Sequence, residues 1–392
     1  MLQLLQLFKS DGWEITFGSA ANRPERCADL SELVSREVEV ELNSSSFDEL
    51  IRDLNPDAVL FDRFMTEEQF GWRVAKHCPN AIRMLDTEDL HCLREARGKA
   101  LKASDPFRPE DLLAEELALR EVASIYRSDV SIMISEVEIG ILKEVFNVDD
   151  SLISYLPFLS NGISEEREGC WKGFDARQDF VTIGNFLHPP NLDAVKYLKN
   201  EIWPLIRKEL PKVEMHVYGA YGSDHHMALN HARSGFLVKG FAEDVNEVMS
   251  NARLCLAPLR FGAGLKGKLL DAMMNGTPSV TTSIGAEGMK GAFEWPGSIE
   301  NEPEAFAQAA VQAYKDEKVW IEARNKIRPL VNSRFDRIEH GQRFLAEANG
   351  IRQNLASHRK QNFVGAMLNH HTMRSTEFMS RWIETKNRLS AD

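Results

Sequence analysis

The residues whose types and spacing are best suited to bind a ligand lie in segment 260–282, which has the sequence RFGAGLKGKLLDAMMNGTPSVTT. The apolar run LCLAPL ahead of it is predicted to be a strand, and KLLDAMMN a helix that ends at Gly276. Open α/β sheets bind ligands in the loops that follow the carboxyl ends of their strands. A helix N-terminus there presents unpaired backbone N–H groups and about half a positive charge.

Glycines and lysines make this helix start suitable for an anion. Gly262 and Gly264 remove side chains, so that a ligand can approach the backbone amides, and Lys266 and Lys268 add positive charge. The combination fits a phosphate or diphosphate, and Asp271, one or two turns into the helix, could accept hydrogen bonds from ribose hydroxyls. A tight strand-to-helix turn with solvated lysines is the alternative, and this segment alone does not decide between them.

Acidic residues end two predicted strands in the first half of the chain. Asp62 ends DAVLFD and is followed by Arg63, and Asp86 ends AIRMLD. Further titratable residues follow closely, namely Glu88, Asp89, His91, Arg94 and Arg97. Such clusters at strand ends are candidates for substrate binding or proton transfer. The alternative is an ordinary helix start, with acids in the first turn and arginines later.

Short β-rich runs alternate with amphipathic stretches twice along the chain, with a polar break over Asn161–Asp179. Alternation of this kind predicts an α/β fold of two doubly wound, Rossmann-like domains with parallel sheets, facing each other across a cleft. The expected boundaries are 1–165 for the first domain, 178–320 for the second and 321–392 for a helical C-terminal extension that packs back on the first domain.

The start of the chain departs from this scheme. A doubly wound domain opens with a strand at the centre of its sheet, whereas this chain opens with the predicted helix MLQLLQLFKSDG and meets its first strand at Trp13. We therefore expect either that residues precede Met1 or that the first sheet is irregular.

Composition narrows the function classes. The 392 residues carry a net charge of −12, which disfavours binding to nucleic acid. The five cysteines are scattered without a CxxC pair, which favours a reducing compartment and argues against a zinc site. No apolar run is long enough to span a membrane. The expected location is the cytoplasm. Peripheral contact with the inner face of a membrane is left open, through the N-terminal helix or the basic C-terminal stretch 359–388.

The second half resembles the nucleotide-sugar-binding domain of family 4 glycosyltransferases of the GT-B fold. The resemblance rests on FVTIGNFLHPPNLDAVKYL (180–198), VEMHVYG (213–219), VKGFAEDVNEVMSNARLCLAPLRFGAGLKGKLLDAMMNGTPSVTT (238–282) and SIGAEGM (283–289). The first half is similar more loosely, in DAVLFDRF, RMLDTEDLHCLREAR and SDVSIMISEVEIGIL. The resemblance implies transfer of a sugar from a nucleotide donor, usually with retention of configuration and without an essential metal or other cofactor.

The resemblance also implies roles for residues. The implied donor-binding set comprises Gly184, Asn185, Gly240, Phe241, Arg260, Gly262, Gly264, Leu265, Lys266, Lys268 and Asp271. Within it, Lys266 and the amides of Gly264 and Leu265 would hold the diphosphate. The catalytic candidates are Lys266, Asp86 and His91, and the acceptor-side candidates are Asp62, Arg63, Asp89 and Arg94.

Two departures from the family pattern bear on these roles. The first of two glutamates that many relatives carry falls on Ala263, and the basic pair after the first strand of the domain is replaced by GNFLHPPN. A non-catalytic scaffold and a nucleotide-sugar epimerase therefore stay open beside the transferase. The expected partners are a nucleotide-diphosphate sugar and a saccharide, lipid-linked or protein acceptor.

Overall fold

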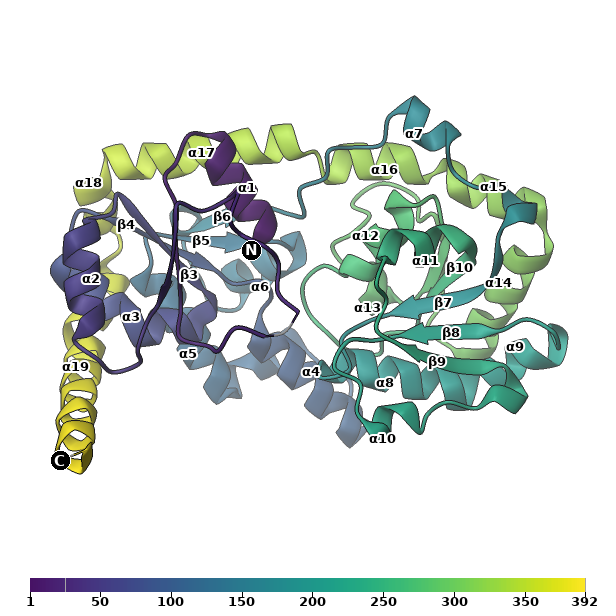
Figure 1. Cartoon of the computed structure of the whole chain (residues 1–392), viewed down its shortest axis with the longest axis horizontal. Helices are drawn as coiled ribbons and strands as arrows, with labels where there is room; N and C mark the ends of the chain where they lie inside the picture. The colour runs from purple at the N-terminus through teal and green to yellow at the C-terminus, as the bar shows by residue number, and fades with distance from the viewer. Residues whose placement is uncertain (25, 392) are drawn as a thin grey trace. The chain divides into compact units, whose positions relative to one another are not determined.

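The computed structural model describes residues 1–24 and 26–391, without the side chains of residues 371–373 and 391. The chain forms two compact units, each described here by itself (Figure 1). Unit 1 contains Met1–Leu90, Leu113–Leu159 and the described residues from Glu339 onward, and unit 2 contains His91–Leu112 and Ser160–Ile338. Both units contain parallel sheets covered by helices, and the C-terminal region is helical, which confirms the predicted fold class.

Unit 1 contains two separate parallel sheets. Its strands are β1 (Thr16–Ser19), β2 (Arg36–Glu39), β3 (Ala58–Asp62), β4 (Ile82–Asp86), β5 (Val130–Met133) and β6 (Ile153–Tyr155). The first two pair with each other, and the other four form a sheet in the order β3-β4-β5-β6. Its helices are α1 (Leu2–Ser10), α2 (Ser46–Leu54), α3 (Arg63–His77), α5 (Glu116–Arg127), α6 (Glu136–Glu144), α17 (Arg337–Gln353), α18 (Leu355–Gln361) and α19 (Phe363–Ala391). The first sheet is thus irregular, which is one of the two expectations for this region.

The apolar face of α1 is part of the core of unit 1. Leu4, Leu7 and Phe8 are buried against strand residues such as Ile82 and against Phe344 of α17. Core packing therefore accounts for this face, which was one of the two candidates for membrane contact. None of the helices in the described ranges combines the length and the apolar content that crossing a membrane requires.

Unit 2 contains one six-stranded parallel sheet in the order β12-β11-β10-β7-β8-β9. Its strands are β7 (Gln178–Ile183), β8 (Met215–Tyr218), β9 (Phe236–Gly240), β10 (Ala252–Ala257), β11 (Ser279–Thr281) and β12 (Gly297–Ile299). Its helices are α4 (His91–Ala103), α7 (Glu165–Gly169), α8 (Pro189–Tyr197), α9 (Trp203–Glu209), α10 (Asp224–Met227), α11 (Val245–Asn251), α12 (Gly267–Met274), α13 (Ser283–Ala286), α14 (Pro303–Lys315), α15 (Glu317–Asn325) and α16 (Ile327–Arg334). Helices α8, α9 and α14 enclose the main core on one face, while α11 and α12 lie on the other (Figure 1).

The unit boundaries differ from the predicted ones at three places, one of which is the short segment 160–165, which belongs to unit 2. Residues 91–112 belong to unit 2, where α4 packs against the loop after β10. Residues 321–338 also belong to unit 2, where α16 packs on α12. The strands β6 and β12, each three residues long, were not predicted.

A buried arginine fixes the amino-terminal side of the sheet in unit 2. Arg177, at the entry to β7, is fully buried. Its guanidinium donates to the carbonyls of Lys172 (2.9 Å), Asn275 (2.7 Å) and Ala252 (3.2 Å), and to the hydroxyl of Thr277 (2.7 Å). The side chain thereby ties the interdomain segment to the turns that precede β10 and β11.

We predict that Arg177→Met lowers the free energy of unfolding of unit 2 by about 3–5 kcal/mol, because it leaves several buried carbonyls without a donor. Urea denaturation followed by tryptophan fluorescence measures this, since Trp203 and Trp320 lie in the core of the unit. Arg233→Met, at an exposed position of the same unit, is the matched control and should change stability little. Equal effects of the two substitutions would contradict the assignment.

Candidate functional site

The strand order of unit 2 brings the ends of β7 and β10 together. Counted from β7, the sheet has the order 3-2-1-4-5-6, so its direction reverses between β7 and β10. These strands pair in register, with Phe180 opposite Leu254 and Val181 opposite Cys255. Ligands of doubly wound sheets bind at the carboxyl ends of the strands at such a reversal. Gly184 follows β7, and the loop before α12 follows β10, so both lie at this point.

The loop before α12 has a backbone conformation that requires glycine. Gly262 and Gly264 have φ angles of +152° and +62°, which side chains with a Cβ rarely adopt. Helix α12 starts at Gly267, with Lys266 as the residue that precedes it. The predicted strand, glycine loop and helix start are therefore all present.

Lys266 is folded back onto this loop. Its Nζ donates to the carbonyls of Gly264 at 2.6 Å and Ala263 at 3.1 Å, and the residue is buried. A trans peptide unit points its C=O and N–H in opposite directions. The N–H groups of Gly264 and Leu265 belong to those two peptide units and therefore point away from the ammonium group.

Lys268 approaches Gly184 from the first turn of α12. Its Nζ donates to Oδ1 of Asn191 at 2.7 Å. A Cβ on Gly184 would lie 2.8 Å from the Asn191 amide and 3.0 Å from the Lys268 Nζ, so a larger residue there would displace these two side chains. Burial lowers the pKa of Lys268 to about 8, which leaves most of the ammonium protonated at pH 7. Asn191 was not among the predicted residues.

Two other predicted donor-binding residues are Arg260, which forms an ion pair, and Asp271, which is affected by burial. The guanidinium of Arg260 forms a bidentate ion pair with Asp193 of α8, at 2.9 and 2.5 Å, and lies over the ring of Tyr197. Burial raises the pKa of Asp271, within α12, to about 6.

Three further predicted donor-binding residues lie at or just after the ends of strands. Asn185, after β7, is exposed, and its side chain accepts from the Leu187 amide at 2.8 Å. Gly240 ends β9, and Phe241 follows it with 39% of its surface exposed. Gly240 has a φ angle of +78°, and its carbonyl accepts from the amide of Gly219 at 2.7 Å.

Helix α4 holds the glycine loop from its other side. Arg97 donates to the carbonyl of Gly262 at 2.8 Å and to both carboxylate oxygens of Glu287 at 2.7 and 2.8 Å. The next residue, Gly98, lies so close to Phe261 that an added Cβ would be 3.1 Å from its ring. The role of Arg97 and Glu287 was not predicted, since these residues are 190 positions apart and no local pattern links them.

In unit 1, the structure brings together several of the predicted acceptor-side residues. Asp62 and Asp86 are paired in register at the ends of β3 and β4. Arg63 lies 3.1 Å from the Asp62 carboxylate and 3.7 Å from Glu88. Burial raises the pKa of Asp86 to about 6, and its carboxylate accepts from the Glu88 amide at 3.3 Å.

The residues after β4 divide between the two units. Asp89 belongs to unit 1, whereas His91 and Arg94 lie on α4 in unit 2. The Leu90 amide donates to Glu138 at 3.2 Å, and Glu138 is fully buried in the first turn of α6. Glu138 thus fixes the point at which the chain leaves unit 1.

One group of possible metal ligands occurs among the described residues. Asp179, Glu214 and His216 offer ligand atoms within 4.8 Å of one another. They lie at or near the amino-terminal ends of β7 and β8, the opposite edge of the sheet from the glycine loop. Glu214 and His216 bind each other at 2.8 Å.

Comparison with known proteins finds a family model that matches this part of the chain. Residues 177–316 match the family model described as Glycosyl transferases group 1. The matched glycosyltransferase segment includes β7, β10, the glycine loop and α12, the elements that form the candidate site.

One curated relative shares part of this segment. An uncharacterized 44.6 kDa protein in the cps region of Klebsiella pneumoniae is 29% identical over 113 residues, which are 27% of this chain and 29% of the relative. The match therefore spans less than a third of either protein.

Solved structures share the fold of the whole chain. HepE of Anabaena has a TM-score of 0.63 at 13% identity and covers 88% of this chain and 94% of its own. Sucrose-phosphate synthase of Thermosynechococcus elongatus has a TM-score of 0.63 at 15% identity, and the match covers 91% of this chain and 92% of the synthase. TarM of S. aureus has a TM-score of 0.58 at 14% identity, and the match covers 77% of this chain but only 58% of TarM. The fold is GT-B, as the resemblance implied.

We predict that Arg97→Gln loosens the glycine loop. Hydrogen exchange of the amides of residues 261–266 should become at least about tenfold faster, because the loop loses its tie to α4. Lys99→Gln, at an exposed position of the same helix, should leave these amides unchanged. The double substitution Arg97→Glu with Glu287→Arg should restore part of the protection of these amides. Hydrogen exchange in Arg97→Gln that equals that of the unchanged protein would contradict the role of Arg97 in holding the loop.

We predict that Asp86→Asn stabilises the protein at pH 7.5 and not at pH 4. The pKa of Asp86 is raised from 3.8 to about 6, so the unfolded state ionises first and stability falls as the pH rises from about 4 to about 6. Removing the buried charge should add up to about 3 kcal/mol above that window. Thermal unfolding at the two pH values measures this, with exposed Asp53→Asn as the control. Equal stabilisation at both values would show that the charge is not the cause.

Proposed function

We propose that the chain transfers a sugar from a nucleotide-diphosphate sugar to an acceptor hydroxyl, with retention of configuration and without an essential metal ion. The observation that carries the proposal is the glycine loop at the β7–β10 reversal, which combines a helix N-terminus with Lys266 and Lys268. The match of residues 177–316 to group 1 glycosyl transferases supports it. The acceptor belongs to one of three classes, namely saccharides, lipid-linked acceptors and proteins.

In this mechanism the loop stabilises the leaving group. The bond between the anomeric carbon and the β-phosphate oxygen breaks, and negative charge develops on the diphosphate while the sugar becomes cationic. Backbone amides and ammonium groups that are already oriented stabilise such a charge without reorganisation. Lys266 orients the amides of Gly264 and Leu265 by holding the carbonyls of the same peptide units. Lys268 provides the second ammonium group, and an anion beside it offsets the cost of its burial.

The acceptor completes the reaction. Its hydroxyl oxygen forms the new bond to the anomeric carbon from the face that the diphosphate leaves, and its proton passes to the departing phosphate. Asp62, Arg63, Asp89 and Arg94 are assigned to the acceptor. Asp86 is assigned to proton handling, and His91 to the donor sugar. Asp271 is assigned to the ribose.

Uridine diphosphate is the donor nucleotide to test first, because structures of TarM and HepE contain UDP. We predict that UDP raises the midpoint of thermal unfolding, since a ligand at one hundred times its Kd adds about 2.7 kcal/mol to stability. A screen of UDP-, GDP-, ADP- and dTDP-sugars identifies the donor if UDP has no effect.

Substitutions then distinguish a catalyst from a scaffold. Lys266→Ala and Lys268→Ala should each lower kcat/KM for sugar transfer by about 10²- to 10³-fold. Lys196→Ala, at an exposed position of the same domain, should leave it unchanged. Activity should persist in EDTA, and NMR of the first-formed product should show the anomeric configuration of the donor. Absence of both ligand stabilisation and turnover with every donor would favour a scaffold, and conversion of the donor alone would favour an epimerase.

A further inference from the structure

Helix α19 exposes large apolar side chains and buries polar ones, whereas a helix packed on a protein surface normally does the opposite. Large apolar side chains point to solvent, with exposed fractions of 67% for Phe378, 60% for Trp382 and 73% for Leu389. Ser380, by contrast, is buried, and Glu377 and Glu384 are largely covered. Helices of soluble proteins ordinarily bury the apolar stripe and expose the polar one.

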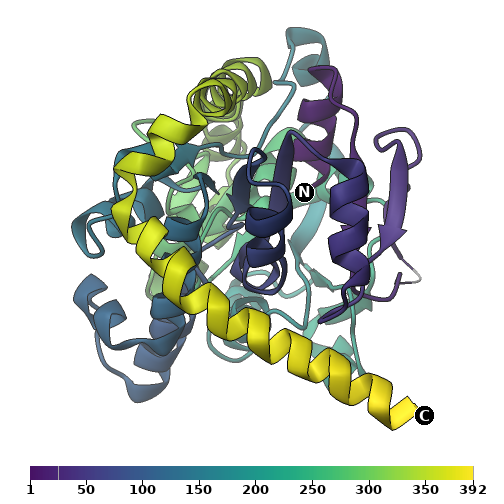
Figure 2. The ribbon, with the colours of Figure 1, turned by 90° about the vertical axis from the view of Figure 1, so that its left-hand side faces the viewer.

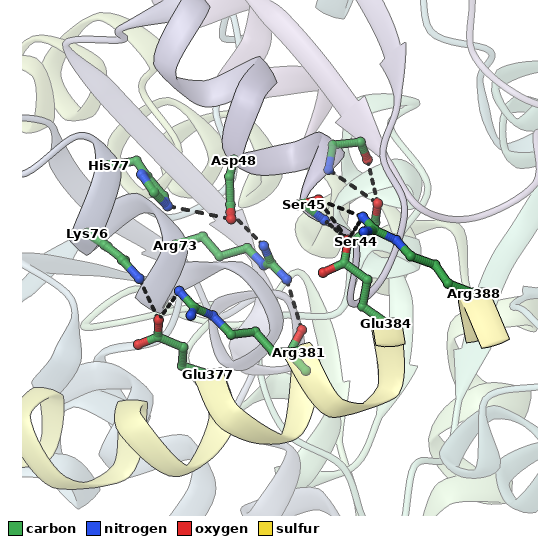
Figure 3. A network of polar contacts seen from close by, with 12 residues as sticks. Ser44, Ser45, Asp48, Arg73, Lys76, His77, Glu377, Arg381, Glu384 and Arg388 are labelled. Atoms are coloured by element: carbon green, nitrogen blue, oxygen red, sulfur yellow. Dashed lines mark hydrogen bonds and ion pairs between the residues drawn. The ribbon is translucent and has the colours of Figure 1, made fainter. Parts of the chain in front are cut away.

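Polar contacts hold the inner face of α19 on unit 1. Glu377 accepts from Lys76 of α3 at 2.5 Å, and Glu384 accepts from the amide and hydroxyl of Ser45 at 3.0 and 2.7 Å (Figure 3). Arg73, which is buried, joins Ser380 at 2.8 Å to Asp48 of α2 at 2.6 Å. These contacts fix the rotation of the helix, so the apolar stripe is held outward.

The first turns of α19 are also tightly packed. A Cβ on Gly365 would lie 2.1 Å from the carbonyl oxygen of Tyr126 in α5. Figure 2 shows α19 in yellow as one straight helix that extends along unit 1 to the C-terminus. The outward stripe is thus part of a firmly docked element.

Cations line the exposed stripe on both sides. Arg374, Arg381 and Arg388 recur every seven residues and so share one flank of the helix, while Lys386 lies on the other flank with its ammonium 5.3 Å from the Trp382 ring centre. All four are exposed, in a chain whose net charge is −12. The acids Glu377 and Glu384 face inward and pair with Arg381 and Arg388 at 2.6 and 2.7 Å. The outward face of the helix therefore carries apolar side chains and cations but none of its acids.

We propose that the outward face of α19 docks the protein on a lipid surface that contains anionic headgroups. Phe378, Trp382 and Leu389 insert at the boundary between headgroups and acyl chains, and the flanking cations contact the headgroups. An apolar stripe with aromatic residues between cations is the pattern of helices that lie in a membrane interface.

Charge disfavours a second copy of this chain as the occupant. Two such helices packed along their stripes would place basic flanks opposite each other in either orientation, because both flanks carry cations. An anionic bilayer complements both flanks at once.

Flotation of the full-length protein with vesicles tests the proposal. The protein should bind vesicles of phosphatidylcholine with 30% phosphatidylglycerol and lose at least about tenfold in binding on pure phosphatidylcholine or at high salt, because screening removes the attraction between headgroups and cations. The double substitution Phe378→Ser with Trp382→Ser should lower binding to the anionic vesicles at least about tenfold. Arg374→Glu with Lys386→Glu should do the same.

Ile338→Ser removes an apolar side chain of similar exposure, 68%, outside α19 and is the matched control. It should bind like the unchanged protein, and circular dichroism should show that all variants are folded. Failure of the unchanged protein to bind anionic vesicles, or equal binding by the double serine variant, would overturn the proposal. A dimer in light scattering that the serine variant dissociates, without vesicle binding, would identify a second copy as the occupant instead.

Discussion

The pairing of β7 with β10 is the constraint on which the candidate site depends. These two strands are neighbours in the sheet although 68 residues separate the end of β7 from the start of β10. Because parallel strands end at the same edge, the pairing brings Gly184 and the loop before α12 to one place. Arg177 fixes the opposite edge by binding the turns that lead into β10 and β11. The position of the loop therefore depends on the pairing of β7 with β10 and on the hydrogen bonds of Arg177.

The glycine loop is held from two directions by cations that bind backbone carbonyls. Lys266 binds the carbonyls of Ala263 and Gly264, and Arg97 binds that of Gly262. A carbonyl held by a cation turns the N–H of its peptide unit to the other side. Amides oriented in this way need little rearrangement to meet a developing negative charge, which is the condition for electrostatic catalysis. Glycines in the loop are needed for its conformation, and the two cations are needed to keep it.

Local patterns in the sequence predicted helices and strands, but they did not predict contacts between residues far apart in the sequence. The β-rich runs and the glycine-flanked helix start are visible within windows of ten residues, so β7, β10 and α12 were predicted. The strands β6 and β12 span three residues each and were not predicted. Asn191 lies 77 residues from Lys268, and Glu287 lies 190 residues from Arg97, so only the tertiary structure brings these pairs together. The same reason explains why the predicted boundaries placed α4 with the first half of the chain, whereas its contacts place it in unit 2.

Three features of the fold oppose its own stability and are therefore informative. Asp86 and Asp271 keep carboxyl groups where burial raises the pKa to about 6, and α19 keeps Phe378, Trp382 and Leu389 in solvent. An asparagine or a polar residue at these positions would fold at least as well, since burying a charge and exposing large apolar surface are both unfavourable. Perturbed carboxyl groups occur at sites that bind or react, and exposed apolar stripes at sites that dock. Asp86 is the last residue of β4, and Asp271 lies in α12, the helix after the loop that follows β10, whereas the stripe lies on the last helix. The two perturbed carboxyl groups and the exposed apolar stripe therefore lie on different elements of the fold.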